Sequence, residues 1–377
     1  MIRQKNRIPL TELITLQRGF DLPERLRKPG SVPVVASTSI NGFHSEAKVS
    51  PPGVVIGRSG SIGGGQYITE PFWPLNTTLW VKDFNGHHPK FIYYFLRSVD
   101  FTRFNAGSGV PTLNRNHLGS ILAPNLSIGE EESIADFLST YDHLIENNRR
   151  RIQLLEESAR LLYQEWFVHL RFPGHEHAKI TDGLPEGWEK TSASNAMEIM
   201  SGGTPKTKVA EYWNGSIPFF TPKDTTDCAF TFSTEKTLTE LGLDKCNSKL
   251  YPKYTVFITA RGTVGKLSFA QQPMAMNQSC YALEGKNEIS QQFLYCSLKS
   301  SIEQFRARAS GSVFDAIVVD TFHRIPFLRP TQPLINEFTE IVGQTFEQVD
   351  KLALMNRKLT QARDLLLPRL MNGELTP

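Results

Sequence analysis

Residues 53–66 read GVVIGRSGSIGGGQ, and residues 255–268 read TVFITARGTVGKLS. Each stretch is an apolar run of β type that breaks into a Gly-x-x-Gly turn, at residues 60–63 and again at residues 262–265. The two copies lie roughly 200 residues apart, a distance far longer than the repeat of a solenoid. The pattern therefore predicts two similar domains in one chain, in agreement with a length of 377 residues.

Further features recur in both copies. Polar clusters follow the turns, Asn-Thr-Thr at 76–78 and Asn-Gln-Ser at 277–279, and Gly/Ser-rich turns come next, AGSGV at 106–110 and ASGSV at 309–313. Strand-like runs bounded by Gly, Pro, Asn and Ser alternate with short helical stretches, so both domains are predicted to be α/β. The strand-like runs are 32–35, 54–56, 78–81 and 254–258, and the short helices are expected at 89–99 and 290–304.

A long helix is predicted after each copy. Apolar residues recur there at steps of three and four, which is the pattern of a coiled-coil seam. Each helix should be about 35 residues and about 50 Å long. The first seam comprises Ile134, Leu138, Tyr141, Ile145, Asn148, Ile152, Leu155, Ala159, Leu162 and Trp166, and the second comprises Ile335, Phe338, Val342, Thr345, Val349, Leu352, Asn356, Leu359, Arg363, Leu366 and Leu370.

Two arrangements of these helices are open. They can pack on each other as an antiparallel pair with one globule at each end, a dumbbell with a pseudo-two-fold axis, or each can pack only on its own globule. In the antiparallel pair, Asn148 and Asn356 fall almost opposite each other. A buried asparagine in an apolar seam lowers stability but fixes register, so this pair is predicted to set the register, and with it the distance between the globules.

Charge separates the globules from the helices. Residues 1–128 hold 14 Lys/Arg and 7 Asp/Glu, whereas residues 129–170 hold 4 and 9. The second half is more balanced, with 18 and 16 in residues 171–332 and 5 and 6 in residues 333–377. Basic globules suit a polyanion such as nucleic acid, and the acidic helices should face another partner.

Composition indicates a soluble cytoplasmic protein. No apolar run approaches the ~20 residues that span a bilayer, and the first residues, MIRQKNRIPLTEL, lack the apolar segment of a secretory signal. The four cysteines all lie in the second half and form no C-x-x-C pair. Reduced cytosolic thiols are therefore expected.

The sequence contains segments that approach known catalytic motifs, but each lacks a required residue. Residues 260–267 approach a phosphate-binding loop, but Ala260 replaces its first glycine and Leu267 replaces the Ser/Thr that holds magnesium. The motif at 57–63, GRSGSIG, has neither the spacing nor the following helix of a dinucleotide site. No Asn/Asp-Pro-Pro-aromatic segment for gripping a flipped base is present. The Glu-Gly-Lys at 284–286 has no matching upstream aspartate and is read as a turn.

No metal site is expected either. His169, His175 and His177 cluster in a polar linker without a nearby fourth ligand or a structured frame. The chain is accordingly predicted to be non-catalytic, with no cofactor of its own.

Basic, amide and hydroxyl side chains near the repeated turns are the candidate DNA contacts, because Arg, Lys, Asn and Gln make bidentate contacts to base edges. In the first copy they are Arg58, Ser59, Ser61, Arg103, Asn105, Thr112, Asn114 and Arg115, and in the second they are Lys206, Lys208, Lys223, Arg261, Thr263, Lys266, Arg306 and Arg308.

The ordered set of segments resembles the specificity (S) subunit of type I restriction-modification systems. GLPEGWEK at 183–190, SGGTPKTKVAEYW at 201–213 and NGSIPFFTPKD at 214–224 are similar to the start of a target-recognition domain in that family. ENNRRRIQLLEESARLLYQEWF at 146–167 resembles the family's central connecting helix, and RDLLLPRLMNGEL at 363–375 resembles its C-terminal end. The first copy departs from this pattern, because its opening, ITLQRGFDLPERLRKPG, lacks the Ser-Gly-Gly-Thr-Pro element.

The resemblance implies two recognition domains that read a split, asymmetric target in double-stranded DNA. It also implies that the helices bind two modification (methyltransferase) subunits and that restriction (translocase-nuclease) subunits join them, so that S-adenosylmethionine, ATP and Mg belong to the partners; no membrane role is implied. Two alternatives stay open: a specificity subunit whose single partner combines methyltransferase and nuclease, and a coiled-coil scaffold without a DNA role. The expected domains are 1–128 (first recognition domain), 129–170 (first helix), 171–190 (linker), 191–332 (second recognition domain) and 333–377 (second helix).

Overall fold

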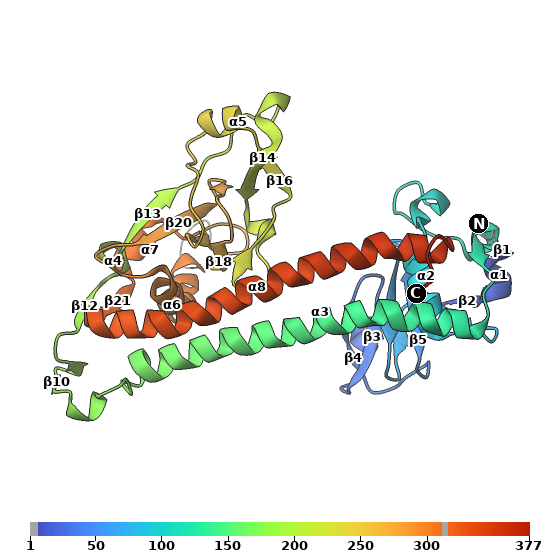
Figure 1. Cartoon of the computed structure of the whole chain (residues 1–377), viewed down its shortest axis with the longest axis horizontal. Coiled ribbons are helices and arrows are strands. Elements are labelled where there is room, and N and C mark those ends of the chain that lie inside the picture. The colour runs from blue at the N-terminus through green and yellow to red at the C-terminus, as the bar shows by residue number, and fades with distance from the viewer. Residues whose placement is uncertain (1–6, 311–315) are drawn as a thin grey trace. The chain divides into compact units, whose positions relative to one another are not determined.

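Two long helices, α3 (Ile128–Tyr163) and α8 (Gln332–Met371), each take part in both halves of the protein. The computed structural model describes residues 7–310 and 316–377. The chain divides into unit 1, Met1–Ile145 with Lys358–Pro377, and unit 2, Glu146–Arg357. The division crosses both helices, so each unit contains one globule and one segment of each helix (Figure 1).

Unit 1 contains a four-stranded sheet of order β2-β8-β5-β6, a three-stranded sheet of order β4-β3-β7, and the pair β1-β9. All five residues of the central strand β5 are buried. Helix α2 begins at a proline, whose fixed φ suits the first helical position, and packs its aromatic and aliphatic face on this sheet. The bounds are β1 (Arg7–Pro9), α1 (Leu10–Leu13), β2 (Thr15–Arg18), β3 (Val32–Val35), β4 (Ile40–His44), β5 (Gly53–Gly57), β6 (Gly63–Ile68), β7 (Trp73–Pro74), β8 (Thr78–Asp83), α2 (Pro89–Ser98) and β9 (Leu122–Pro124).

Unit 2 repeats this topology. Its larger sheet has the order β13-β20-β17-β18-β15, its smaller sheet the order β16-β14-β19, and β12 pairs with β21 as β1 pairs with β9. The one added strand of the larger sheet, β15, lies at its edge. The bounds are β10 (Ile180–Thr181), β11 (Leu184–Pro185), β12 (Glu189–Ser192), α4 (Ala193–Ala196), β13 (Met197–Ser201), β14 (Trp213–Phe220), β15 (Phe230–Thr231), β16 (Lys236–Leu238), α5 (Glu240–Asp244), β17 (Val256–Thr259), β18 (Leu267–Ala270), β19 (Ala275–Met276), β20 (Cys280–Gly285), α6 (Gln291–Ser310), α7 (Val319–Arg324) and β21 (Pro326–Arg329).

The repeated Gly-x-x-Gly turns occupy equivalent places, between β5 and β6 in unit 1 and between β17 and β18 in unit 2. Their four glycines all adopt positive φ, from 76° to 81°, where a side chain would be strained. The amide of Arg58 donates to the carbonyl of Thr77, and the amide of Ala260 donates to that of Ser279, at 2.8 Å each. These bonds make Thr77 structurally equivalent to Ser279. The polar clusters at 76–78 and 277–279 are therefore offset by one residue from the sequence match that pairs Asn76 with Asn277.

A pair of equivalent glycines outside the Gly-x-x-Gly turns explains why the opening segment of the first copy, ITLQRGFDLPERLRKPG, fits the same fold as that of the second. A Cβ at Gly19 would lie 2.1 Å from the carbonyl oxygen of Leu75, and one at Gly202 would lie 2.2 Å from that of Asn277. Both glycines therefore permit the same close approach of two backbones. The first unit keeps this requirement although it lacks the remainder of the Ser-Gly-Gly-Thr-Pro element.

Within each unit, the segments of α3 and α8 pack on each other in antiparallel directions. In unit 2, Ile152, Ala159 and Tyr163 share a core with Phe338, Val342 and Val349. In unit 1, Ile134 and Leu138 share a core with Leu367 and Leu370. The helices therefore do not pack on their own globules alone. The burial pattern departs from the predicted seam at several positions. Tyr163, Phe346 and Leu367 are buried, whereas the predicted Leu162, Thr345 and Leu366 are only partly buried.

The helix ends differ in detail from their predicted forms. α3 continues into a turn of π-helix at Gln164–Val168, and Pro368 lies inside the last turns of α8. The linker contains the short hairpin β10-β11. Helix α6 is longer than the predicted 290–304, so residues 309 and 310 of the expected Gly/Ser turn are helical.

Part of the predicted Gly/Ser turn at 309–313 lies outside the described residues. That part is 311–313, and the first six residues also lie outside the described part of the chain. All four cysteines are free thiols. Within residues 7–310 and 316–377, no helix is long and apolar enough to cross a membrane, and no cluster of three potential metal ligands occurs.

Candidate nucleic-acid interface

The first groove lies on unit 1 beside the Gly-x-x-Gly turn and has a volume of about 710 Å³. Strand β2 contributes Arg18 at its end, and the residue after β5 is Arg58. Leu79 of β8 pairs with Arg18 on one side and with Ile56 of β5 on the other, so the sheet brings the two arginines to the same edge. The groove is lined by Gln17, Arg18, Arg58, Leu79, Ala106, Thr112, Leu113, Asn114 and Arg115.

The charged side chains that line the first groove are all positive. Its lining contains three arginines and no acidic side chain. Neither Arg18 nor Arg58 forms an ion pair with a described residue. Partial burial, and then the charge of Arg18, lower the pKa of Arg58 from its usual value, although a guanidinium remains protonated at neutral pH. The Arg58 Nη1 donates to the carbonyl of Asn76 at 3.2 Å, which holds the guanidinium in place.

The second groove lies on unit 2 and has a volume of about 440 Å³. It is formed on the side of the globule where β14 and β17 end and where β20 begins. Three cations face it, Lys223, Lys236 and Arg261, with one acidic residue, Glu235. The complete lining is Thr221, Pro222, Lys223, Glu235, Lys236, Arg261, Gly262, Thr263, Asn277 and Ser279.

The loop before the second groove is held by local hydrogen bonds. The Asp224 carboxylate accepts from both the amide and the hydroxyl of Thr221, at 2.8 and 2.7 Å, and also from the amide of Glu235 at 2.7 Å. Lys236 lies over the ring of Trp213, 5.6 Å from its centre. The backbone that presents Lys223 is therefore ordered by hydrogen bonds to the Asp224 carboxylate, which is not among the residues that line the groove.

Equivalent positions of the two units have different side chains. The backbone bonds and strand registers align Arg18 with Ser201 and Arg58 with Ala260. The bonds Leu113 N to Arg58 O and Ile317 N to Ala260 O, at 2.8 and 2.9 Å, similarly align Asn114 with Val318. The same scaffold thus presents cations and an amide in unit 1, and small or apolar side chains in unit 2.

The structure brings together some of the predicted contacts and not others. Seven line a groove: Arg58, Thr112, Asn114 and Arg115 in the first, and Lys223, Arg261 and Thr263 in the second. The other nine, Ser59, Ser61, Arg103, Asn105, Lys206, Lys208, Lys266, Arg306 and Arg308, are not among the residues that line either groove.

Several of the nine have local roles in the structure. Arg103 pairs with Asp100, and Asn105 accepts from the amides of Gly107 and Thr112 at 3.0 and 2.9 Å. Arg306 pairs with Glu303 and packs over the Gly265 turn. The sequence interpretation missed Gln17, Arg18 and Lys236. Arg18 lies 40 residues before Arg58 and Gln17 directly precedes Arg18, so only the β2-β8-β5 pairing makes them neighbours of Arg58.

The two seam asparagines meet in unit 2. Asn148 is 4% exposed, and its Nδ2 donates to Asn356 Oδ1 at 2.9 Å. A second polar contact lies in the helix pair of unit 1, where Asp142 accepts from Arg363 Nη1 at 2.5 Å and from the Tyr94 hydroxyl at 2.6 Å. Both polar contacts are specific to one alignment of α3 against α8. That they fix the register stays a prediction.

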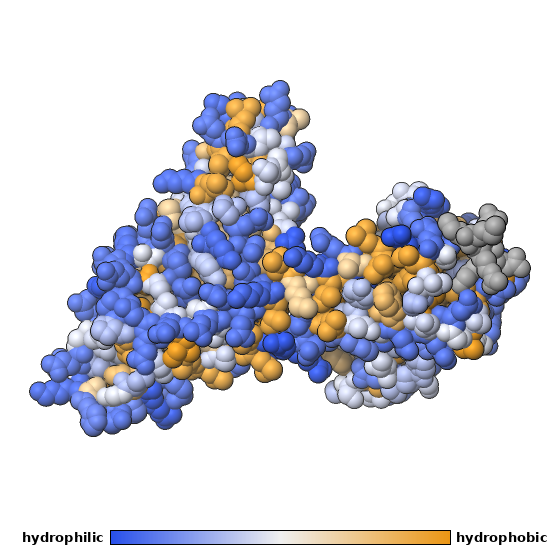
Figure 2. Space-filling view, viewed as in Figure 1, coloured by the Kyte–Doolittle hydropathy of each residue, from blue (hydrophilic) through white to orange (hydrophobic). Residues whose placement is uncertain are grey.

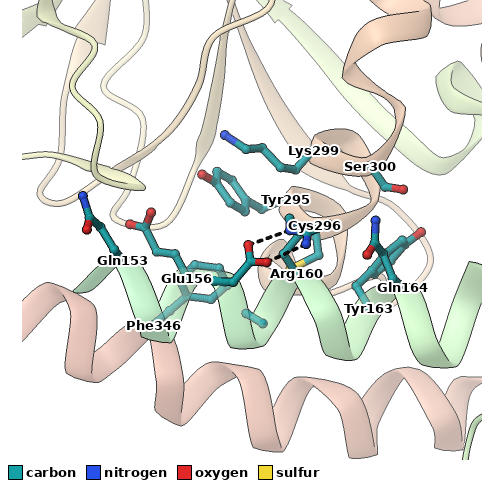
Figure 3. Close-up of a pocket in the computed structure, with 12 residues that line it drawn as sticks. Gln153, Glu156, Arg160, Tyr163, Gln164, Tyr295, Cys296, Lys299, Ser300 and Phe346 are labelled. Carbon is teal, nitrogen blue, oxygen red and sulfur yellow. Dashed lines mark hydrogen bonds and ion pairs between the residues drawn. The ribbon is translucent and has the colours of Figure 1, made fainter. Parts of the chain in front are cut away.

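A third cavity, about 310 Å³ in volume, lies among α3, α6 and α8 of unit 2 (Figure 3). Its walls include the aromatic rings of Tyr163, Tyr295 and Phe346. Glu156 lies at its edge and accepts from the amide of Ala229 at 2.6 Å. Burial raises the pKa of this carboxyl group, and the hydrogen bond opposes the shift.

Apolar side chains are also exposed on the long helices. Leu154 is 70% exposed in unit 2, and Leu365 is 71% exposed in unit 1. Figure 2, in the same view as Figure 1, shows apolar side chains at the surface where α8 passes. The others on these helices are Ile128, Phe137, Leu144, Leu161, Ile341, Leu354 and Met355. Such side chains mark an interaction site where they form a contiguous patch, whereas single exposed apolar residues are common on protein surfaces.

Known proteins match this duplicated architecture. A family model described as the type I restriction modification DNA specificity domain matches residues 5–157 and 185–362. The chain therefore belongs to that family of DNA specificity proteins. The assignment is to the specificity subunits, which are non-catalytic, as the sequence predicted.

Individual relatives agree with the family. The chain is 25% identical to the type I restriction enzyme HindI specificity subunit of Haemophilus influenzae, over 76% of this chain and 77% of that protein. It is 24% identical to the MjaIX specificity subunit of Methanocaldococcus jannaschii, over 87% and 79%. The crystal structure of an S subunit from M. genitalium covers 98% of this chain and 97% of its own with a TM-score of 0.62 at 19% identity, which establishes the shared fold.

Proposed function

We propose that the two globules are separate target-recognition domains, and that each groove contacts one half of a bipartite, asymmetric target in double-stranded DNA. The observation that carries this proposal is the duplicated scaffold with different side chains at equivalent groove positions. Similar domains with unlike contacts suit two half-sites of unlike sequence, because side chains that reach base edges determine specificity. The cationic linings supply the sequence-independent attraction to phosphates.

We further propose that α3 and α8 dock two modification subunits and that restriction subunits join the complex. The exposed leucines of both helices and the acidic charge of residues 129–170 support a protein partner on these surfaces rather than DNA. S-adenosylmethionine, ATP and Mg are then cofactors of those partners. In this arrangement the chain itself binds and positions DNA, and the partners carry out the chemistry.

Methylation mapping tests the proposal. The modification subunit is expressed in a host free of matching methylation, with and without this chain, and the modified positions are read across the genome. We expect a motif of two unlike halves separated by unspecified bases, present only with this chain. A continuous or palindromic motif, or modification that does not depend on the chain, would contradict two unlike readers.

Salt dependence tests the DNA role independently. The logarithm of the binding constant for duplex DNA should fall steeply and linearly with the logarithm of salt concentration for the assembled complex. A coiled-coil scaffold without a DNA role would leave the affinity of the complex unchanged when this chain is omitted.

A further inference from the structure

Arg18 and Arg58 form a pair of like charges at one edge of the β2-β8-β5 sheet. Two guanidinium groups that share a groove repel each other, and no described acidic side chain offsets the repulsion there. Exposure of Arg18 to water and the hydrogen bond of Arg58 to the Asn76 carbonyl reduce this repulsion in the free protein. The groove therefore presents guanidinium N–H donors that can bind an acceptor on a ligand.

The backbone positions that carry these donors are fixed by the sheet. Arg18 ends one strand and Arg58 follows another, and both strands pair with β8. Gly57, next to Arg58, cannot carry a Cβ, which would lie 2.0 Å from the carbonyl oxygen of Ser61. Planar guanidinium donors carried on a fixed backbone, one of them anchored on the Asn76 carbonyl, suit the recognition of a planar acceptor pair.

Guanine fits this donor arrangement best among the four bases. In the major groove it presents two acceptors, N7 and O6, whereas adenine and cytosine each present an amino donor and thymine presents a methyl group. An amino donor placed against two guanidinium groups would have no acceptor and would meet like charge. Two arginines that form no ion pair with a described residue thus select for the base whose edge only accepts hydrogen bonds.

Unit 2 serves as an internal comparison. At the positions equivalent to Arg18 and Arg58 it has Ser201 and Ala260, so the arginine pair is absent there. A guanine reader built on these two positions would consequently belong to one half-site and not to the other.

We propose that Arg18 and Arg58 together recognise the acceptor edge of a guanine in the half-site bound by unit 1. The proposal rests on the proposed function, that is, on unit 1 being a reader of one half of the target. It adds the identity of one base and the two side chains that select it.

The test uses the full chain assembled with its modification subunits and a library of DNA duplexes randomised in both halves. Bound duplexes are sequenced for the wild type and for Arg18→Gln and Arg58→Gln. Arg25→Gln is the matched control, because it also removes one positive charge from unit 1 but lies exposed in the short turn Glu24–Leu26, outside the groove.

The wild type should require guanine at a position of one half-site, and each groove variant should lower the preference for guanine at that position by about 5- to 150-fold. The other half-site should be read as before, which also shows that the variant complex is folded. Arg25→Gln should select the wild-type motif.

Two results would overturn the proposal without touching the proposed function. The first is a groove variant that still selects the same guanine. The second is a uniform loss of affinity for all sequences with a salt slope smaller by about one, which identifies a phosphate contact. If the wild type selects no two-part motif at all, the proposed function itself fails, and the guanine assignment fails with it.

Discussion

The hydrogen bond between Asn148 and Asn356 makes a quantitative prediction for the helix pair of unit 2. Asn148→Leu removes the donor of this 2.9 Å bond from a site that is 4% exposed. Weakening the bond inside an apolar seam should cost about 1–3 kcal/mol, and burial of the leucine should return roughly 1.5 kcal/mol or more. The single variant should therefore change the stability of the pairing by about 2 kcal/mol or less.

The double variant Asn148→Leu/Asn356→Leu should behave differently. Removing both amides leaves an apolar contact, so the pairing should be more stable than in the wild type. The two substitutions are then non-additive, with a coupling free energy of about 1–3 kcal/mol. Hydrogen exchange of the amides in residues 140–160 and 350–365 measures the free energy of local opening for all four members of the cycle.

A matched control is available next to the site. Asn147 is exposed on the same helical turn, and Asn147→Leu should change the opening free energy by about 0.5 kcal/mol or less. Additive single and double variants would refute the coupling of the asparagines. If the pair also fixes register, the double variant in the assembled complex should methylate targets with more than one gap length, and an unchanged single gap would refute that role.

The remaining predictions concern the recognition domains, the third cavity and the docking surface. Exchanging residues 1–128 for another recognition domain should change one half of the methylated motif, and a motif altered in both halves would contradict independent domains. Because burial raises the folded-state pKa of Glu156, the wild type should lose stability as the pH rises from 4.5, the ordinary value, through the raised value. Thermal unfolding of Glu156→Gln should lack this loss, and identical pH profiles would contradict it. Gly202→Ala should prevent stable folding of unit 2, since its Cβ would lie 2.2 Å from the carbonyl oxygen of Asn277. The Cβ of Gly262→Ala meets no atom within 4 Å, so that variant should lose only about 1–2 kcal/mol of stability to positive-φ strain. Equal losses of stability in thermal unfolding would contradict this difference. Leu154→Ser should weaken assembly with modification subunits on size-exclusion chromatography without lowering the unfolding temperature, and unaltered assembly would place docking elsewhere.

The duplication and the long helices could be predicted from the sequence because their physical causes are local. A turn that needs positive φ at two positions needs glycine at both, and that requirement repeats in residues 60–63 and 262–265. A coiled-coil seam needs an apolar residue every three or four positions, so the stripe is visible in the letters alone.

The equivalence of Gly19 and Gly202 has no such local cause. Each is required because a distant backbone, at Leu75 or Asn277, passes within contact distance of its Cα. The same limit applies to Arg18, whose position beside Arg58 depends on strand pairing. Alternation along the strand 15–18 could have placed Arg18 on one face of the sheet, but not next to a particular residue.

Unit 1 contains both ends of the described chain, and Arg7 donates to Asn372 at 3.0 Å. The ribosome therefore makes most of unit 1 first, then the whole of unit 2, and only afterwards the helical turns of α8 that cover Ile134 and Leu138. At about 5–20 residues per second, this interval lasts on the order of 10 to 40 seconds. Unit 2 is continuous in sequence and can be completed during that time. The unit that is translated first is thus completed last, and until then its nascent form exposes an apolar strip of the kind that holding chaperones bind.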